Sequence, residues 1–245
     1  MFDAITQKKA SLKTVIDGLG KQPREDLITS QLFGTIRFLE HAARKQALEI
    51  LTGHPLSGEA DIHLWPRFGP GRGTEPDVVI TLKQGEIVKY WIIEVKWGAR
   101  FSGEGNQPHR EIAAVRDADT RTGAFTSAPR EVAGYTLLGA ESKHDAEMKD
   151  VEELETSLSV YSLRWPEVNQ SLKRLSKEAA DSGLAAWAKC AADFLSSTPQ
   201  GFALGNWPAM PTPEITRFTF DTNRRFEWDV SCEPVSVCQF HFDMN

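Results

Sequence analysis

The chain has 245 residues, 40% of them hydrophobic and 25% charged, an ordinary globular composition long enough for one large domain or one domain with an extension. The 28 Lys and Arg residues against 34 Asp and Glu give a formal net charge of -6, which argues mildly against a strong autonomous nucleic-acid binder. The sequence has no apolar run that would span a membrane, no secretory signal, and three cysteines without a disulfide or zinc pattern. We therefore expect a cytoplasmic protein without a membrane partner.

The N-terminal part of the chain is predicted to be helical. Apolar positions at helical spacing predict a helix over residues 2–17. Pro23 then opens a second helical pattern, which is expected to run as one helix to the glycine at position 53. Glu25 and Asp26 stand in its first turn, where the helix dipole favours negative charge.

Strands and helices are predicted to follow in alternation. The apolar and alternating segments indicate strands at residues 60–65, 77–82, 87–97, 134–140 and 159–165. The second and third of these strands are joined by the turn sequence KQGE and are expected to form an antiparallel hairpin. Helices are predicted over residues 106–119, 145–156 and 167–195. Residues 216–230 and 235–244 show the alternation of a further antiparallel hairpin.

The segment WIIEVKW, residues 91–97, places two opposite charges inside an apolar strand. Because side chains alternate along a strand, Glu94 and Lys96 share one face, whereas Ile93 and Val95 point to the other. Burying such a pair is costly without partners, and so apolar a strand is expected to be central in its sheet. Counting back from the turn puts Asp77 close to the level of Glu94. The hairpin is therefore predicted to bring two carboxylates together beside one ammonium group.

This trio suits metal-assisted hydrolysis of a phosphodiester. Mg²⁺ takes oxygen ligands, usually one or two carboxylates together with waters and phosphate. The metal polarises a phosphoryl oxygen and lowers the pKa of a bound water. Lys96 would orient or deprotonate that water, or neutralise the charge that develops in the transition state. We expect Mg²⁺ as the cofactor, with Mn²⁺ as a substitute.

The order of these elements resembles the PD-(D/E)xK nuclease superfamily, which has the restriction-endonuclease-like fold. The motif is carried here by Pro76-Asp77, the hairpin and the run from Glu94 to Lys96. The resemblance covers roughly residues 24–165. It implies an α/β fold with a mixed central sheet flanked by helices, N-terminal helices before it and a C-terminal helical and hairpin extension after it. Residues 1–165 would form the nuclease core with its helical lead, and residues 166–245 the extension packed on it.

The resemblance also implies roles for single residues. Asp77 and Glu94 would hold the metal, and Lys96 would be catalytic. Glu25 is the preferred candidate for the additional acid that the helix before the core often contributes, with Asp26 as the alternative. Gln107 sits where many members have a glutamine, near the start of the helix after the hairpin.

Each of these residues also has a simpler interpretation. A Glu-x-Lys pair on a strand is often a solvated ion pair, although the apolar neighbours and Asp77 argue against that here. Glu25 and Asp26 also fit a capping or dipole role, and Gln107 also fits a helix start. Candidate contacts to nucleic acid are Arg72, Arg100 and Arg110, arginine being equally common on ordinary surfaces.

The sequence thus predicts a metal-dependent nuclease that hydrolyses DNA phosphodiester bonds. By resemblance it would be an endonuclease in a microbial restriction or anti-phage defence setting, and cutting both strands at once would suggest a homodimer. One alternative is a non-catalytic nuclease-fold module that binds nucleic acid or a protein partner in a larger complex. Another is a metal hydrolase that acts on a nucleotide or second messenger.

Overall fold

The structure, a computed structural model, describes residues 25–71, 73–98, 101, 106–120 and 123–197, together with the backbone of residues 215–220 and 226–230. The chain divides into two compact units, residues 1–202 and residues 203–245. The helix predicted over residues 2–17 and the segment 235–244 lie outside the described residues. No helix within the described ranges combines the length and the apolar character needed to cross a membrane.

The first unit is built on an open, mixed five-stranded sheet, so the predicted α/β class is confirmed at this level. The strands lie side by side in sequence order: β1 (Glu59–Leu64), β2 (Val78–Gln84), β3 (Ile87–Val95), β4 (Glu131–Leu138) and β5 (Ser159–Leu163). Strands β1, β2 and β3 are antiparallel, whereas β3, β4 and β5 are parallel. Strand β3 therefore lies in the middle of the sheet, as its apolar sequence predicted.

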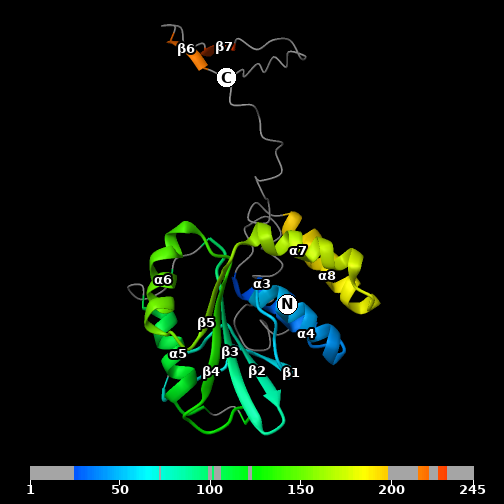
Figure 1. The fold of residues 1–245 in the computed structure, drawn as a ribbon, viewed down its shortest axis with the longest axis vertical. Helices are drawn as coiled ribbons and strands as arrows, with labels where there is room; N and C mark the ends of the chain where they lie inside the picture. Colours follow the sequence, from blue (N-terminus) through cyan, green and yellow to red (C-terminus); the bar gives the residue numbers. More distant parts are fainter. Residues whose placement is uncertain are drawn as a thin grey trace. The chain divides into compact units, whose positions relative to one another are not determined.

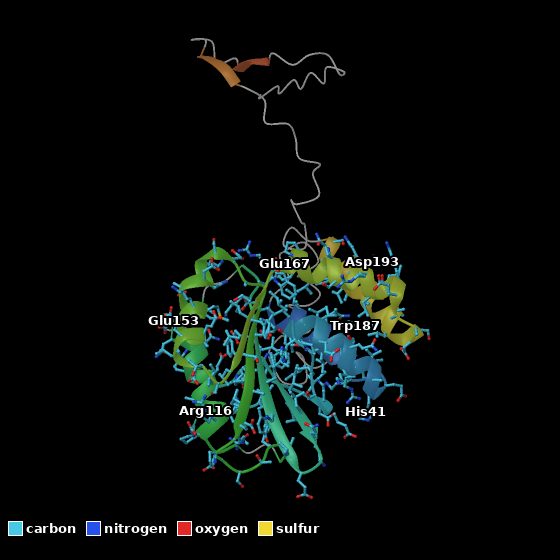
Figure 2. The ribbon with its side chains drawn as sticks, in the orientation of Figure 1. His41, Arg116, Glu153, Glu167, Trp187 and Asp193 are labelled. Atoms are coloured by element: carbon cyan, nitrogen blue, oxygen red, sulfur yellow. The ribbon has the colours of Figure 1, made fainter. Side chains whose placement is uncertain are left out.

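Helices cover both faces of this sheet (Figure 1). Helices α5 (Gln107–Asp117) and α6 (Asp145–Leu154) lie on one face. On the other face lie α3 (Glu25–Ile36), α4 (His41–Thr52), α7 (Trp165–Glu178) and α8 (Ser182–Ser196). Figure 2 shows side chains filling both interlayer spaces, with Arg116 and Glu153 on the α5–α6 side and Trp187 on the α8 side.

The alternation of β3 divides the core into two clusters, one on each face of the sheet. Ile93 and Val95 belong to the cluster beneath α3, α4, α7 and α8. Ile92 belongs to the cluster beneath α5 and α6. Glu94 has the parity of Ile92, so its side chain faces α5. The face assignment made from the sequence is confirmed.

The single helix predicted from Pro23 to residue 53 is wrong, because the segment forms two helices that break after Ile36. A straight helix of that length would extend about 46 Å, well beyond the roughly 30 Å of the nine-residue strand β3. The break lets both helices pack on the same sheet face. Arg44 stabilises it by donating to the backbone oxygens of Arg37 (3.1 Å) and Leu39 (3.3 Å).

The predictions for residues 167–195 and for the C-terminal hairpin are also corrected. The helical segment over residues 167–195 is two helices, α7 and α8, and Asp181 caps the second by accepting from the Leu184 backbone N–H at 2.7 Å. In the second unit, β6 (Ile215–Phe220) pairs antiparallel with β7 (Phe226–Val230). Residues 215–230 thus supply both strands of this hairpin. The prediction that residues 216–230 form one strand of a hairpin, with residues 235–244 as the other, is wrong. The polar run DTNRR, rich in turn-forming residues, interrupts its alternation.

Candidate active site

Asp77 stands at the entry to β2, between the ends of β1 and β3. Val78 pairs with Ile93, so Asp77 falls at the level of Glu94, as the count from the turn predicted. The Asp77 backbone oxygen accepts from the Trp65 N–H at 2.9 Å, and its Oδ2 accepts from the Val95 N–H at 3.0 Å. The carboxylate is thus held between its two neighbouring strands.

Desolvation raises the pKa of Asp77 well above its usual value, and the charge of Glu94 raises it further. The Val95 N–H and Lys96 oppose this rise. Glu94 and Lys96 thus both influence the pKa of Asp77, as expected for three side chains that converge.

Glu94 and Lys96 form a buried ion pair on the α5 side of β3. The Lys96 Nζ donates to Glu94 Oε1 at 2.6 Å, and the two residues are only 5% and 3% exposed, respectively. Burial raises the pKa of Glu94 to about 8, and the negative charge of Glu111 adds to the rise. Burial lowers the pKa of Lys96, but the Glu94 carboxylate outweighs that effect, so the pKa of the lysine is raised overall. Because Glu94 and Lys96 are buried, they do not form the solvated surface ion pair that the sequence left open as an alternative.

Gln107, the first residue of α5, joins this pair. Its Nε2 donates both to Glu94 Oε1 and to Glu111 Oε1, the latter at 2.7 Å. Its Oε1 lies 3.5 Å from the Lys96 Nζ. Gln107 therefore lies at the site and does more than begin a helix.

Glu111 and Tyr135 belong to the same network and were missed from the sequence. Glu111 is 2% exposed, and its Oε2 accepts from the Tyr135 hydroxyl at 3.0 Å. Burial raises the pKa of Glu111 to about 7. A signal was present, because Glu111 lies one helical turn after Gln107 and directly precedes the buried Ile112, which places it on the inward face of the helix.

Glu25 reaches the site from the opposite layer of helices. Its Oε1 accepts from the Trp97 backbone N–H at 2.8 Å, directly after β3 ends. Its charge raises the pKa values of both Asp77 and Lys96. Glu25, in the first turn of α3, thus has a defined contact to this strand end.

The site offers carboxylate oxygens to the expected hard cation. In the described parts of the chain, no three His, Cys, Asp or Glu side chains are grouped so that they alone would hold a metal ion. One feature nevertheless fits a cation: Glu94 Oε2 is buried and has no hydrogen-bond partner, and buried carboxylate oxygens are ordinarily partnered. Carboxylates are also the oxygen donors that Mg²⁺ and Mn²⁺ accept. The residues present therefore fit such an ion, with Glu94 Oε2 as its most evident ligand atom.

The candidate nucleic-acid contacts are only partly placed. Arg72 and Arg100 lie outside the described residues. Arg110 is exposed on α5, one turn beyond Gln107 and next to Glu111. Its neighbour His109 pairs with Asp150 of α6 at 2.8 Å, which joins the two helices.

Comparisons of this chain with protein-family models, with curated proteins and with solved structures found no match.

Proposed function

We propose that this protein is a metal-dependent nuclease that hydrolyses DNA phosphodiester bonds, and that its first unit adopts the restriction-endonuclease-like fold. The observation that carries the proposal is the buried, unpartnered oxygen of Glu94, in a carboxylate paired with Lys96 and coupled to Asp77. A mixed five-stranded sheet with helices on both faces supports the fold assignment.

In this proposal Asp77 and Glu94 hold Mg²⁺, for which Mn²⁺ can substitute, and Glu25 assists from α3. When bound, the ion would supply positive charge that polarises a phosphoryl oxygen and lowers the pKa of a water. Lys96 holds its proton in the resting state because its pKa is raised. Its ammonium group is then suited to orienting the attacking water and to neutralising charge that develops on the phosphate.

The biological setting rests on the motif alone. The resemblance to PD-(D/E)xK nucleases supports an endonuclease in microbial restriction or anti-phage defence. A formal charge of -6 means that DNA binding would rely on local cations and not on the overall field.

The test is cleavage of supercoiled plasmid by the full chain with Mg²⁺, with Mn²⁺ and with EDTA. We expect cleavage with either metal, none with EDTA, and a loss of about 100-fold or more in Lys96→Ala, since such a group contributes roughly that factor. Lys89→Ala is the matched control: Lys89 lies on the same strand but is 44% exposed and pairs with Glu131. Its activity should stay within about twofold of the wild type.

The same assay separates the alternatives. The lack of a grouped three-acid site among the described residues favours a non-catalytic module as the second candidate. Wild-type protein that binds DNA but never cuts it with either metal would support that module. Cleavage of mononucleotides or RNA in place of DNA would instead support a different metal hydrolase.

A further inference from the structure

A continuous chain of hydrogen bonds runs from β4 through α5 to the ion pair on β3. Tyr135 donates to Glu111 Oε2 at 3.0 Å, and Gln107 Nε2 donates to Glu111 Oε1 at 2.7 Å. The same Nε2 donates to Glu94 Oε1, which also accepts from the Lys96 Nζ. All five members of this network, Lys96 included, are at most 9% exposed. The proposed nuclease mechanism assigns no role to Glu111 or to Tyr135.

These hydrogen bonds fix the orientation of the Gln107 side-chain amide. An amide nitrogen has two hydrogens, and here each one has a carboxylate acceptor, Glu94 on one side and Glu111 on the other. The amide oxygen is left to face the Lys96 Nζ at 3.5 Å. A flipped amide would place its oxygen against both carboxylates, so Glu111 excludes that orientation.

Because the Gln107 amide is fixed, the two carboxylate oxygens of Glu94 differ in their hydrogen bonds. Oε1 accepts from Lys96 and from Gln107 and is fully used. Oε2 is buried with no partner. The network therefore holds the carboxylate in the rotation that leaves Oε2 available.

We propose that Glu111 is a positioning residue, which acts through Gln107 to commit Glu94 Oε1 and to present Glu94 Oε2 to a divalent cation. This inference rests on the proposed function, because it names the atom that would bind the metal. Both oxygens of Glu111 accept hydrogen bonds of their own, so Glu111 acts as an acceptor and not as a ligand.

The acceptor role predicts that a neutral isostere is sufficient at this position. In Glu111→Gln the new amide oxygen accepts from Gln107, and the new amide nitrogen donates to the Tyr135 oxygen, which is both donor and acceptor. Glu111→Ala removes the acceptor and frees the Gln107 amide to rotate. Tyr135→Phe removes only the outer donor and keeps the ring in the core.

The experiment measures Mn²⁺ and Mg²⁺ binding to each full-length variant by calorimetry and by metal-induced change in Tm, alongside plasmid cleavage. We expect Glu111→Gln to bind metal within about threefold of wild type. We expect Glu111→Ala to bind about 10- to 100-fold more weakly, the usual loss when a partner of a ligand is removed. Tyr135→Phe should fall between these two.

A double variant tests whether Glu111 acts through Gln107. If it does, Gln107→Ala with Glu111→Ala should lose no more metal affinity than the worse of the two single variants. Fully additive losses would overturn the proposal. If Glu111→Ala fails to fold, Glu111→Gln and Tyr135→Phe still give the affinities that decide it.

Other outcomes separate this proposal from the proposed function. Metal affinity lost equally in Glu111→Gln and Glu111→Ala would mean that the charge of Glu111 is used directly, and unchanged affinity in Glu111→Ala would mean a merely structural role. Either result overturns the positioning role and leaves the nuclease activity of the wild type intact. Wild-type protein that neither binds metal nor cleaves DNA would overturn both proposals.

Discussion

At the scale of single residues, the candidate site concentrates carboxyl groups where water is excluded. Asp77, Glu94 and Glu111 all have raised pKa values, and burial is the largest cause for each. One lysine and one glutamine oppose that cost by direct hydrogen bonds. Such a cluster lowers the stability of the folded state, and perturbed groups of this kind gather at functional sites. A bound cation would remove much of the cost.

We predict that the metal-free protein becomes less stable as the pH rises from 5 to 8. The folded-state pKa values of Glu94 and Glu111 are about 8 and about 7, both above the ordinary value of 4.5. The folded state therefore holds these protons more tightly than the unfolded state. Their stabilising contribution is complete below pH 4.5 and is lost as the pH rises through the folded-state values.

Denaturant unfolding in EDTA at a series of pH values measures this effect. Glu94→Gln removes one of the carboxyl groups with a raised pKa, so the free energy of unfolding of this variant should fall less steeply with pH than that of wild type. Added Mg²⁺ should stabilise the wild type more at pH 8 than at pH 5, because protons compete with the metal at low pH. Equal slopes for the wild type and Glu94→Gln would show that Glu94 does not titrate in this range.

At the scale of elements, the sequence carried the information for the hairpin but not for the helix breaks. The β2–β3 register follows from the alternation and the turn, which act over neighbouring residues, so the level of Asp77 was predictable. The break after Ile36 depends on the length of the sheet face, which is a property of the assembled layers. Glu111 was missed for a related reason, since its partner Tyr135 comes from another element, 24 residues further along the chain.

The junction of β4 with the end of β3 fixes the backbone of Lys96. The Lys96 N–H donates to the Leu138 oxygen and its own oxygen accepts from Trp165 Nε1, both at 2.8 Å. Gly139 passes so close that an added Cβ would lie 2.0 Å from the Lys96 oxygen and 2.3 Å from Trp165 Nε1. Its φ of +89° also disfavours any other residue.

We therefore predict that Gly139→Ala displaces Lys96 and destabilises the protein. We expect a loss of about 2–4 kcal/mol in the free energy of unfolding, as for other strained or overpacked substitutions, with a strong loss of cleavage. Gly123→Ala is the matched control, because nothing lies within 4 Å of its added Cβ and its φ is not positive. Thermal and denaturant unfolding of both variants measure the difference. A Gly139→Ala protein as stable and active as Gly123→Ala would contradict this account of the junction.

At the scale of the whole first unit, the sheet topology places the candidate site at the end of the sheet where the parallel strands terminate. Strands β3, β4 and β5 are parallel, so their C-terminal ends meet there, together with the entry to β2 and the exit from β1. Asp77, Glu94 and Lys96 all lie at these ends. In open α/β sheets with parallel strands, ligands bind in the crevice outside the carboxyl ends of the strands.

Arg164 stands at this same end of the sheet, directly after β5 and at the start of α7. The next residue, Trp165, donates to the Lys96 oxygen, which ties this corner of the fold to the candidate site. The Arg164 side chain is exposed, and the backbone N–H of Arg164 donates to Glu167 Oε2 at 3.2 Å. The N-terminus of α7 adds its partial positive charge at the same point. Under the proposed nuclease function, an arginine in this position would be suited to contact a DNA phosphate.

We predict that Arg164→Ala weakens DNA binding without impairing the chemical step. The KM for DNA should rise about 3- to 10-fold and the salt dependence of binding should decrease by about one unit of slope, while kcat stays nearly constant. Arg174→Ala is the matched control, since Arg174 is also exposed on α7 but lies ten residues, or about 15 Å, further along the helix. Steady-state cleavage and binding at several salt concentrations give these quantities. Equal effects of the two substitutions would mean that DNA responds only to the general charge of the helix, and a specific contact between Arg164 and a DNA phosphate would then be ruled out.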